Sequence, residues 1–400
     1  MKLNVAVFFG GESVEHEVSV ISAHQAMNAM DSGKYNIIPI YVAKDRKLYC
    51  SDLLRDMKMY KDIPALLKKC TQVTLIQKDN RVAVCPVHTG LFGRKELATI
   101  DVAVPVMHGT NGEDGTIQGF LEMLKLPYAG CDLIAAAVGQ DKVLQKHTLE
   151  NSGLPITKWF WYFGSELESH KDEILAKVHE IGYPVILKPA CTGSSVGIGI
   201  AHNDEEYLLQ FEDSRQYDAK VITEQVVKPM REINCSVLGN AEKAQASVLE
   251  EVFSGGGELL DFHDKYERKA KGSKTAPAAS KGMASSSRVV DPDLPKGVNE
   301  KIRQLALDTF RVLGSSGVCR IDFMMNADTT DVYVNEINTI PGSLAFYLWQ
   351  SSGVSFPELM DRIIELALDR ERERSRRTYS YDTNLLSTYS EPAGAKGTKS

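Results

Sequence analysis

Four polar side chains late in the chain have the types and spacing of a magnesium site. They lie in two strand-like runs joined by a turn-rich stretch of Asn, Asp and Thr. Because strand residues two apart share a face, Arg320 projects with Asp322, and Glu336 projects with Asn338. A turn midway between the runs would place Asp322 opposite Glu336. Carboxylate and amide oxygens at this density suit Mg²⁺, whose remaining positions are often filled by nucleotide phosphates.

The alternative for the same residues is an exposed sheet face crossed by salt bridges. Like charges placed directly opposite each other destabilise a sheet unless a cation lies between them. The pairing of Asp322 with Glu336 therefore favours a metal site.

Lys188 stands at the end of an apolar run and is followed by a loop of small residues, 189–197. The amides and hydroxyls of such a loop could close over phosphates. The loop lacks the GxxxxGK[ST] pattern, so it is not a Walker A loop. A plain connecting turn would explain it equally well, and only the magnesium patch elsewhere makes it a candidate phosphate loop.

Two further groups carry a weaker signal. His108 opens a polar, glycine-rich loop after an apolar run, a place that faces the ligand crevice in α/β sheets. A buried, hydrogen-bonded structural histidine is the alternative. Glu15 stands near the start of a helical run, where a carboxylate is favoured by the helix dipole alone.

The elements that must position these side chains begin with a parallel α/β rhythm. Short β-branched runs at 5–9, 37–42 and 102–107 alternate with amphipathic segments, which predicts buried parallel strands. A helix is expected over 15–30, with Ser13 as its cap. The loop after the first strand lacks GxGxxG, so no dinucleotide site is predicted.

The rest of the chain is expected to form a helix at 141–152, a strand at 184–188 and a hairpin that carries Arg320 and Asn338. The polar, Lys- and Ser-rich stretch 267–288 has neither helical nor strand period and should be a mobile loop. Residues from about 378 onward are expected to be a disordered tail.

Composition excludes several classes of function. The chain of 400 residues is 43% hydrophobic and 25% charged, with a net charge of −7, so it offers no cationic field for nucleic acid or an anionic membrane. No apolar stretch is long enough for a signal sequence or a transmembrane helix. Seven scattered cysteines never form CxxC, which indicates reduced thiols in the cytoplasm. A small-molecule partner is the better expectation.

Short motifs in a fixed order span roughly residues 3–370. Together they resemble the D-alanine–D-alanine ligase family of the ATP-grasp superfamily. The motifs are Gly10-Gly-Glu-Ser-Val-Glu-His-Glu-Val-Ser19, His108-Gly-Thr-Asn-Gly-Glu-Asp-Gly115, Pro127-Tyr-Ala-Gly130, Asp141-Lys142, Lys188-Pro, Gly193-Ser-Ser-Val-Gly197, Lys265-Tyr266, Arg320-Ile-Asp322 and Asn335-Glu-Ile-Asn-Thr-Ile-Pro-Gly342.

The resemblance implies an α/β and α+β architecture: an N-terminal Rossmann-like domain (1–126) and an ATP-grasp fold of two lobes (127–219 and 220–372), followed by the tail (373–400). It implies that ATP phosphorylates the carboxylate of a first D-alanine. The amine of a second D-alanine would attack the acyl phosphate, giving a peptidoglycan precursor. It also implies two Mg²⁺ ions, with Mn²⁺ as a possible substitute, and a homodimer.

The resemblance assigns roles by motif position. Glu15, Ser194 and Tyr266 would order the catalytic site, with Glu15 on the first ammonium, and Arg320 and the Gly342 amide would steady the tetrahedral oxyanion. His108 would lie beside the carboxylate of the first substrate, and Ser343 would bind the carboxylate of the second substrate. Nucleotide contacts would come from Lys142, Lys188, Ser195, Glu224 (adenine), Glu232 (ribose) and Lys265, and Asp322, Glu336 and Asn338 would bind the metal ions.

The chain departs from the family pattern in three places. The region around Lys265-Tyr266 is less tyrosine-rich than usual, and the spacing from Glu224 to Glu232 needs one inserted residue. The segment after Gly342 is a few residues shorter than is common, which leaves D-serine or D-lactate open as the second substrate. Another ATP-grasp carboxylate–amine ligase would lack the Glu15 and His108 motifs, and a non-catalytic nucleotide-binding protein would not need the metal residues.

Overall fold

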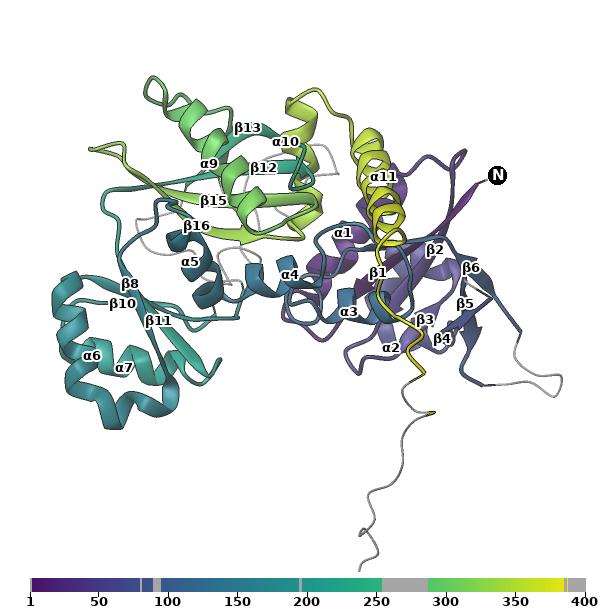
Figure 1. Cartoon of the computed structure of the whole chain (residues 1–400), viewed down its shortest axis with the longest axis horizontal. Helices are drawn as coiled ribbons and strands as arrows, with labels where there is room; N and C mark the ends of the chain where they lie inside the picture. Colours follow the sequence, from purple (N-terminus) through teal and green to yellow (C-terminus); the bar gives the residue numbers. More distant parts are fainter. Residues whose placement is uncertain are drawn as a thin grey trace, which may run out of the picture.

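The computed structural model describes residues 2–79, 81–88, 95–193, 196–253, 287–384 and 387. Three β-sheets, each with helices packed against it, form a mixed α/β molecule. Figure 1 shows the N-terminal sheet on one side, the C-terminal sheet beside it, and a smaller lobe that projects away from both.

The N-terminal sheet has seven strands in the order β6-β5-β4-β3-β2-β1-β7. The pairs β1–β2 and β1–β7 are parallel, which confirms the rhythm predicted for this region. The pairs from β2 to β6 are antiparallel, so the expectation of a wholly parallel sheet is wrong. The strands are β1 (Leu3–Gly10), β2 (Tyr35–Val42), β3 (Leu48–Cys50), β4 (Thr71–Lys78), β5 (Arg81–Pro86), β6 (Ala98–Ile100) and β7 (Val102–Pro105).

Helix α1 (His16–Ala29) follows β1 and begins one residue after Glu15. Ser13 does not cap it; its hydroxyl accepts the Glu15 N–H at 3.1 Å, one turn too early for a cap. Further along, α3 (Thr116–Met123) and α4 (Leu133–Gln140) contact each other. The short helices of this region are η1 (Asp52–Arg55), η2 (Met57–Asp62) and α2 (Ile63–Leu67).

The projecting lobe is an antiparallel four-stranded sheet in the order β10-β9-β11-β8. Its core lies between the sheet and two helices, and includes Leu187, Val221, Ile174 and Phe211. The elements are β8 (Trp159–Phe163), η3 (Gly164–Glu166), α6 (Leu167–Ile181), β9 (Val185–Pro189), β10 (Gly199–Ala201), α7 (Asp204–Ser214) and β11 (Lys220–Gln225).

The C-terminal sheet has the order β14-β13-β12-β15-β16 and is antiparallel throughout. Asp322 pairs with Glu336, so the predicted hairpin is confirmed. The apolar face of the sheet packs against α4, α5 and α9. The elements are α5 (Lys142–Asn151), β12 (Met230–Gly239), β13 (Ala244–Phe253), β14 (Ser287–Val290), α9 (Val298–Val312), β15 (Gly317–Asn326) and β16 (Val332–Asn338).

After β16 the chain returns to the N-terminal sheet through η5 (Gly342–Ala345), α10 (Phe346–Ser351) and α11 (Phe356–Arg374). One continuous core joins these last helices to β1 and α1, with Trp349 and Ile363 packed among residues such as Val7 and Met27. Figure 1 shows α11 lying along the N-terminal domain.

The divisions expected at 126/127, 219/220 and 372/373 stay predictions; β11, which begins at Lys220, is a strand of the projecting lobe's sheet. The loop predicted for 267–288 lies outside the described residues up to 286, whereas its last two residues belong to β14. Most of the expected tail is also outside. All seven cysteines are free thiols.

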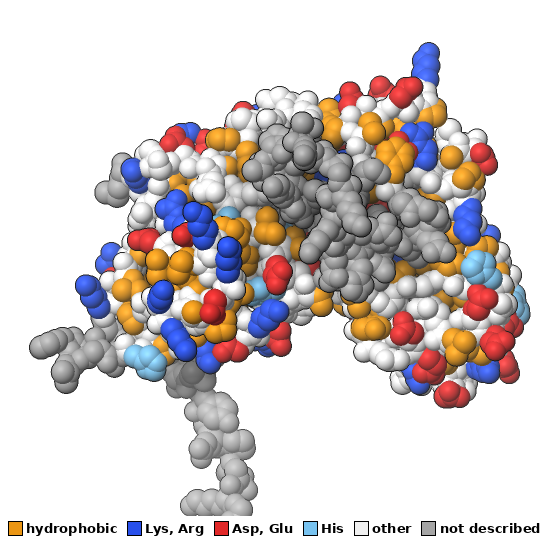
Figure 2. Space-filling view, turned by 180° about the vertical axis from the view of Figure 1, so that it is seen from behind, with side chains coloured by type: hydrophobic (Ala, Val, Ile, Leu, Met, Phe, Trp, Pro, Cys, Tyr) orange, Lys and Arg blue, Asp and Glu red, His pale blue; other side chains and the backbone are white. Residues whose placement is uncertain are grey.

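No helix in the described part of the chain is both long and apolar enough to cross a membrane. On the face drawn in Figure 2, Lys and Arg side chains lie among Asp and Glu side chains. The mixture of signs agrees with the net charge of −7 and with a small-molecule ligand.

Candidate active site

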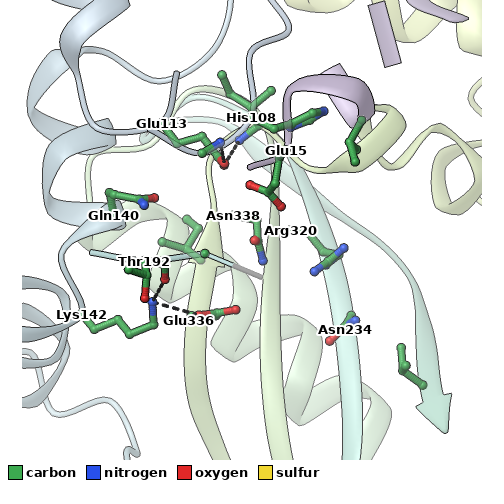
Figure 3. A pocket seen from close by; sticks show the side chains of 18 of the residues that line it. Glu15, His108, Glu113, Gln140, Lys142, Thr192, Asn234, Arg320, Glu336 and Asn338 are labelled. Carbon is green, nitrogen blue, oxygen red and sulfur yellow. Dashed lines mark hydrogen bonds and ion pairs between the residues drawn. The ribbon is translucent and has the colours of Figure 1, made fainter. Parts of the chain in front are cut away.

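A cavity of about 150 Å³ lies where the N-terminal domain, the C-terminal sheet and the loop after β9 meet. Figure 3 shows Glu15 and His108 on one side of it, with Lys142 and Glu336 on another. Of the residues proposed from the sequence, the cavity brings together Glu15, His108, Lys142, Glu232, Arg320, Glu336, Asn338 and Gly342.

Cross-strand pairing places the acidic residues in a row. Glu250 on β13 pairs with Asn234 on β12, Asn234 pairs with Asp322 on β15, and Asp322 pairs with Glu336 on β16. Since directly opposed residues share a face, these side chains are neighbours over four strands.

Asp322 is held by its neighbours in the next row. The Arg320 guanidinium donates two hydrogen bonds of 2.7 Å to its two oxygens, and Asn338 Nδ2 donates a third at 2.9 Å. Burial raises the pKa of Asp322, the guanidinium works in the opposite direction, and the charges of Glu336 and Glu250 raise it further. Asp322 and Glu250 are buried and Glu336 is partly exposed, and neighbouring carboxylates of this kind are stabilised by a hard divalent cation. The donor set of Asp322, Glu336 and Asn338 therefore fits Mg²⁺.

Lys142 lies at the start of α5 and points toward the row. Its Nζ donates to the Thr192 carbonyl at 2.9 Å and lies 3.7 Å from Glu336 Oε2. The backbone N–H of Lys142 also donates to Ala190 at 3.1 Å, which ties the helix to the loop after β9. The ammonium is thereby placed between that loop and the acidic row.

Glu224 and Lys188 are buried and do not line this cavity. The Glu224 carboxylate is 1% exposed and pairs with Lys146 at 2.9 Å and with Lys188 at 3.1 Å. Thr157 donates a further hydrogen bond of 3.0 Å to it. The two ammonium groups outweigh the effect of burial and lower the pKa of Glu224 to about 2. The sequence motifs did not single out Lys146, because a buried lysine and a lysine on an exposed helix face look the same in a sequence.

The loop that begins with His108 approaches Glu15 closely. Gly109 has φ +72°, and a Cβ there would lie 2.5 Å from Ser13 Oγ and 3.0 Å from Glu15 Oε2. A residue with a side chain would therefore displace Glu15 or the loop. This close approach explains why glycine follows His108.

Glu113 is a site residue that sequence reasoning missed. It lines the cavity, and its carboxylate accepts the backbone N–H of Gly109 at 2.9 Å and that of Ile340 at 3.0 Å. Burial and the neighbouring charge of Glu15 raise its pKa to about 8. Glu113 thus joins two loops that face the cavity. Glu113 belongs to the motif that begins at His108, but nothing in the motif indicates its contact with Ile340.

A second group missed from the sequence lines the opposite wall. Glu250 is 2% exposed and accepts a hydrogen bond of 2.8 Å from the Tyr347 hydroxyl, while Arg288 lies 3.6 Å from its other oxygen. The Arg288 guanidinium also stacks 4.8 Å from the Tyr347 ring centroid. Glu250 and Tyr347 are 97 residues apart in the sequence, so only the fold could reveal the group.

The remaining predicted residues divide into two sets. Ser343 is buried beside the cavity, next to Gly342, and its backbone N–H donates to Ser22 Oγ at 3.0 Å. Ser194, Ser195, Lys265 and Tyr266 lie outside the described residues, so their roles stay predictions.

Family models match both halves of the chain. The model described as D-ala D-ala ligase N-terminus matches residues 4–131, and that described as D-ala D-ala ligase C-terminus matches residues 148–365. A D-alanine–D-alanine ligase from Thermosipho melanesiensis is 36% identical over 385 residues, covering 96% of this chain and 98% of the relative. One from Thermoanaerobacter sp. is 37% identical over 384 residues, covering 94% and 99%.

Solved structures give the same result. The D-alanine–D-alanine ligase from Coxiella burnetii superposes with a TM-score of 0.75 at 29% identity and covers 97% of this chain and 98% of that one. The VanG D-Ala:D-Ser ligase from Enterococcus faecalis has a TM-score of 0.73 at 26% identity and covers 92% and 100%. The expected architecture, a Rossmann-like domain followed by an ATP-grasp fold, is confirmed. By sequence and by fold, the chain belongs to the D-alanine–D-alanine ligase family.

Proposed function

We propose that this protein is an ATP-dependent, Mg²⁺-requiring ligase that joins two D-alanines to supply a peptidoglycan precursor. One observation carries the proposal: Arg320, Glu250 and Glu336 line the same cavity as Glu15 and Lys142. A carboxylate substrate, an ammonium and a phosphate can therefore meet in one place. The names of the relatives support D-alanine as the substrate.

On the nucleotide side, Lys142 and Lys188 would contact the phosphates, covered by the loop that contains Ser194 and Ser195. Lys265 would add a further contact, and Glu232, in the cavity wall, would meet the ribose. The buried position of Glu224 favours an indirect role over the adenine contact expected first. Its carboxylate keeps Lys146 and Lys188 charged and fixed.

Asp322, Glu336 and Asn338 would hold the two magnesium ions. Bound Mg²⁺ neutralises charge on the transferring phosphoryl group. For Asn338 to offer its oxygen, its amide must turn, because Nδ2 now faces Asp322. Lys142 adds a fixed positive charge near the same row.

The chain's own residues would orient the two amino acids. Glu15 binds the ammonium of the first, with Ser194 and Tyr266 in the same hydrogen-bonded set. Arg320 and the Gly342 N–H stabilise the oxyanion of the tetrahedral intermediate. Ser343 would receive the carboxylate of the second. His108 lines the same cavity as Glu15, Arg320 and Gly342, and would lie beside the carboxylate of the first D-alanine.

D-serine or D-lactate is the alternative second substrate. The shortened segment after Gly342 leaves this alternative open. The presence of a D-Ala:D-Ser ligase among the structural neighbours supports keeping it.

A homodimer in the cytoplasm is the proposed state. Phe120, Met123 and Ile134 expose 41%, 84% and 70% of their surface on the adjoining helices α3 and α4. An apolar patch of this kind suits a partner surface. Light scattering of the wild type and a Met123→Asp/Ile134→Asp variant tests it; a wild-type monomer would refute the dimer.

The activity is tested by ADP release with Mg²⁺ and ATP, and the product is identified by mass. D-alanine alone should give ADP and a dipeptide. L-alanine should give neither, and Asp322→Asn should abolish both products. ADP release only with added D-serine or D-lactate would support the alternative second substrate. No ADP release with any D-amino acid would refute the proposal.

A further inference from the structure

Ser22 is a buried hydroxyl that joins two loops of the active site. It lies on α1, is 1% exposed, and does not line the cavity. Its Oγ lies 3.0 Å from His108 Nε2 and 3.0 Å from the backbone nitrogen of Ser343. One oxygen therefore contacts the loop after β7 and the loop after β16.

Hydrogen-bond chemistry fixes the direction of one of these contacts. The Ser343 N–H can only donate, so Ser22 Oγ accepts it. The hydroxyl keeps its proton and a second lone pair for His108 Nε2, and the tautomer of the ring decides which of the two groups donates there. Burial lowers the pKa of His108, which favours the neutral ring.

The loop on the other side of Ser22 has an unusual backbone. Ser343, Leu344 and Ala345 have φ of 53°, 53° and 50°, three successive non-glycine residues in the left-handed region. L-residues rarely adopt this conformation, and it persists only when surrounding contacts enforce it. The Ser343 N–H bond to Ser22 is one such contact, and the Leu344 N–H bond to the Pro341 carbonyl at 2.7 Å is another.

We propose that Ser22 is a positioning residue that holds the left-handed turn at Ser343–Ala345 in place for the second substrate and fixes the His108 ring against that turn. The inference rests on the proposed function, since the turn is where the second carboxylate would bind. Ser22 touches neither substrate, and it acts through Ser343 and His108.

Ser19 offers a matched control. It lies one turn earlier on α1, is fully buried, accepts the Gly10 N–H at 2.8 Å and donates to the Val106 carbonyl at 2.6 Å. Its partners are the ends of β1 and β7, away from the turn. Removing its hydroxyl should cost stability as much as removing that of Ser22, without acting on the second-substrate loop.

The experiment compares Ser22→Ala, Ser22→Cys and Ser19→Ala in the full-length protein. The measured quantities are kcat and separate KM values for the first and second D-alanine. Both Ser22 variants should raise the KM of the second substrate about tenfold, with the first KM within about twofold. Cys has the shape of Ser with a larger and weakly bonding sulfur atom, so it fills the site without the hydrogen bonds, whereas Ala removes both.

A cysteine variant that matches the wild type would assign the effect to packing and overturn the proposal. Equal increases of both KM values, or the same pattern in Ser19→Ala, would also overturn it. Failure of the wild type to form a dipeptide would instead refute the proposed function. The ¹⁵N resonances of the His108 ring give a readout independent of turnover: Ser22→Ala should shift the Nε2 resonance from its wild-type position and Ser19→Ala should not, and an unchanged Nε2 resonance in Ser22→Ala would contradict the Ser22 contact.

Discussion

At the scale of single residues, charge pairing decides which groups in the cavity are ready to act. The Arg320 guanidinium donates two hydrogen bonds of 2.7 Å to Asp322. The Lys142 ammonium donates to the Thr192 carbonyl and lies near the Glu336 carboxylate. Bound substrates and metal ions must compete with these contacts. The partners are thereby held in position before any ligand arrives.

Arg320→Ala should lower turnover by roughly 10³-fold, because it removes a donor aimed at the oxyanion. ATP affinity should change little, since none of the proposed nucleotide contacts comes from Arg320. Turnover and calorimetric nucleotide binding are the measurements, with Arg320→Lys as a charge-preserving comparison. Near-normal turnover in the alanine variant would overturn the role given to Arg320.

Glu113 predicts a pH dependence of stability. Its pKa is raised from 4.5 to about 8 in the folded protein, so the folded state holds this proton more tightly. The stabilisation is complete below pH 4.5 and is lost as the pH rises through about 8, at no more than about 1.4 kcal/mol per pH unit. Urea unfolding from pH 5 to 8 should show a decline that Glu113→Gln reduces. Parallel pH profiles of the two proteins would contradict this.

The buried trio of Glu224, Lys146 and Lys188 predicts the opposite trend at acid pH. The lowered pKa of Glu224, about 2, contributes stability above pH 4.5 that is lost as the pH falls through about 2. Glu224→Gln should cost about 3–5 kcal/mol in urea unfolding at pH 7, because two buried ammonium groups lose their partner.

Lys146→Met is the matching change for this trio. Combined with Glu224→Gln, it should cost less than the sum of the two single variants, because one ammonium group no longer needs the carboxylate. Additive costs in this double-mutant cycle would show that the groups do not interact.

At the scale of elements, the sequence predicted the features that depend on neighbouring residues, such as strand periodicity and turns. The hairpin and the opposition of Asp322 to Glu336 follow from a period of two and a central turn, and both are present. Two strands of the antiparallel half of the first sheet, β3 and β6, have three residues each, too few for a period, and the longer β4 and β5 were not singled out. Glu113, Glu250 and Lys146 were missed because their partners are far away in sequence.

The junction between two elements depends on paired glycines. Gly317, at the start of β15, has φ +79°, and a Cβ there would lie 2.7 Å from the Gly130 Cα. Gly317→Ala should destabilise the protein by about 2–4 kcal/mol and lower activity, because it forces β15 away from the 127–131 segment.

Gly314 provides the control for this substitution. Its φ is +65°, but the space around it is open, so Gly314→Ala measures backbone strain alone, about 1 kcal/mol. Thermal unfolding and turnover of both variants separate strain from collision. Equal losses would remove the argument for close packing at the junction.

At the scale of the whole molecule, the active site exists only where separate units meet. Glu15 and His108 belong to the N-terminal domain, whereas Arg320 and Glu336 belong to the C-terminal sheet. The two are tied together by the shared core that α11 completes. The projecting lobe has its own core and contributes through the loop after β9.

Ile364→Ala in α11 should cost about 2–5 kcal/mol and lower amide protection in β1 and β2, far away in sequence. Protection of β8–β11 should persist. Leu187→Ala, in the core of the projecting lobe, should give the reverse pattern. Uniform loss of protection in both variants would mean that the chain unfolds as one unit.

The return of α11 to the first sheet has a consequence for synthesis on the ribosome. The strands of that sheet are complete by residue 105, but the core residues of α11 end at Ala367, about 260 residues later. At ~5–20 residues per second, the ribosome needs roughly 13–52 s to synthesise the chain between β7 and the end of the α11 core. Helix α1 covers part of the sheet's apolar face by then, but the part that α11 covers stays exposed during that time. We therefore expect the cellular yield of this protein to depend on chaperones that shield the emerging chain.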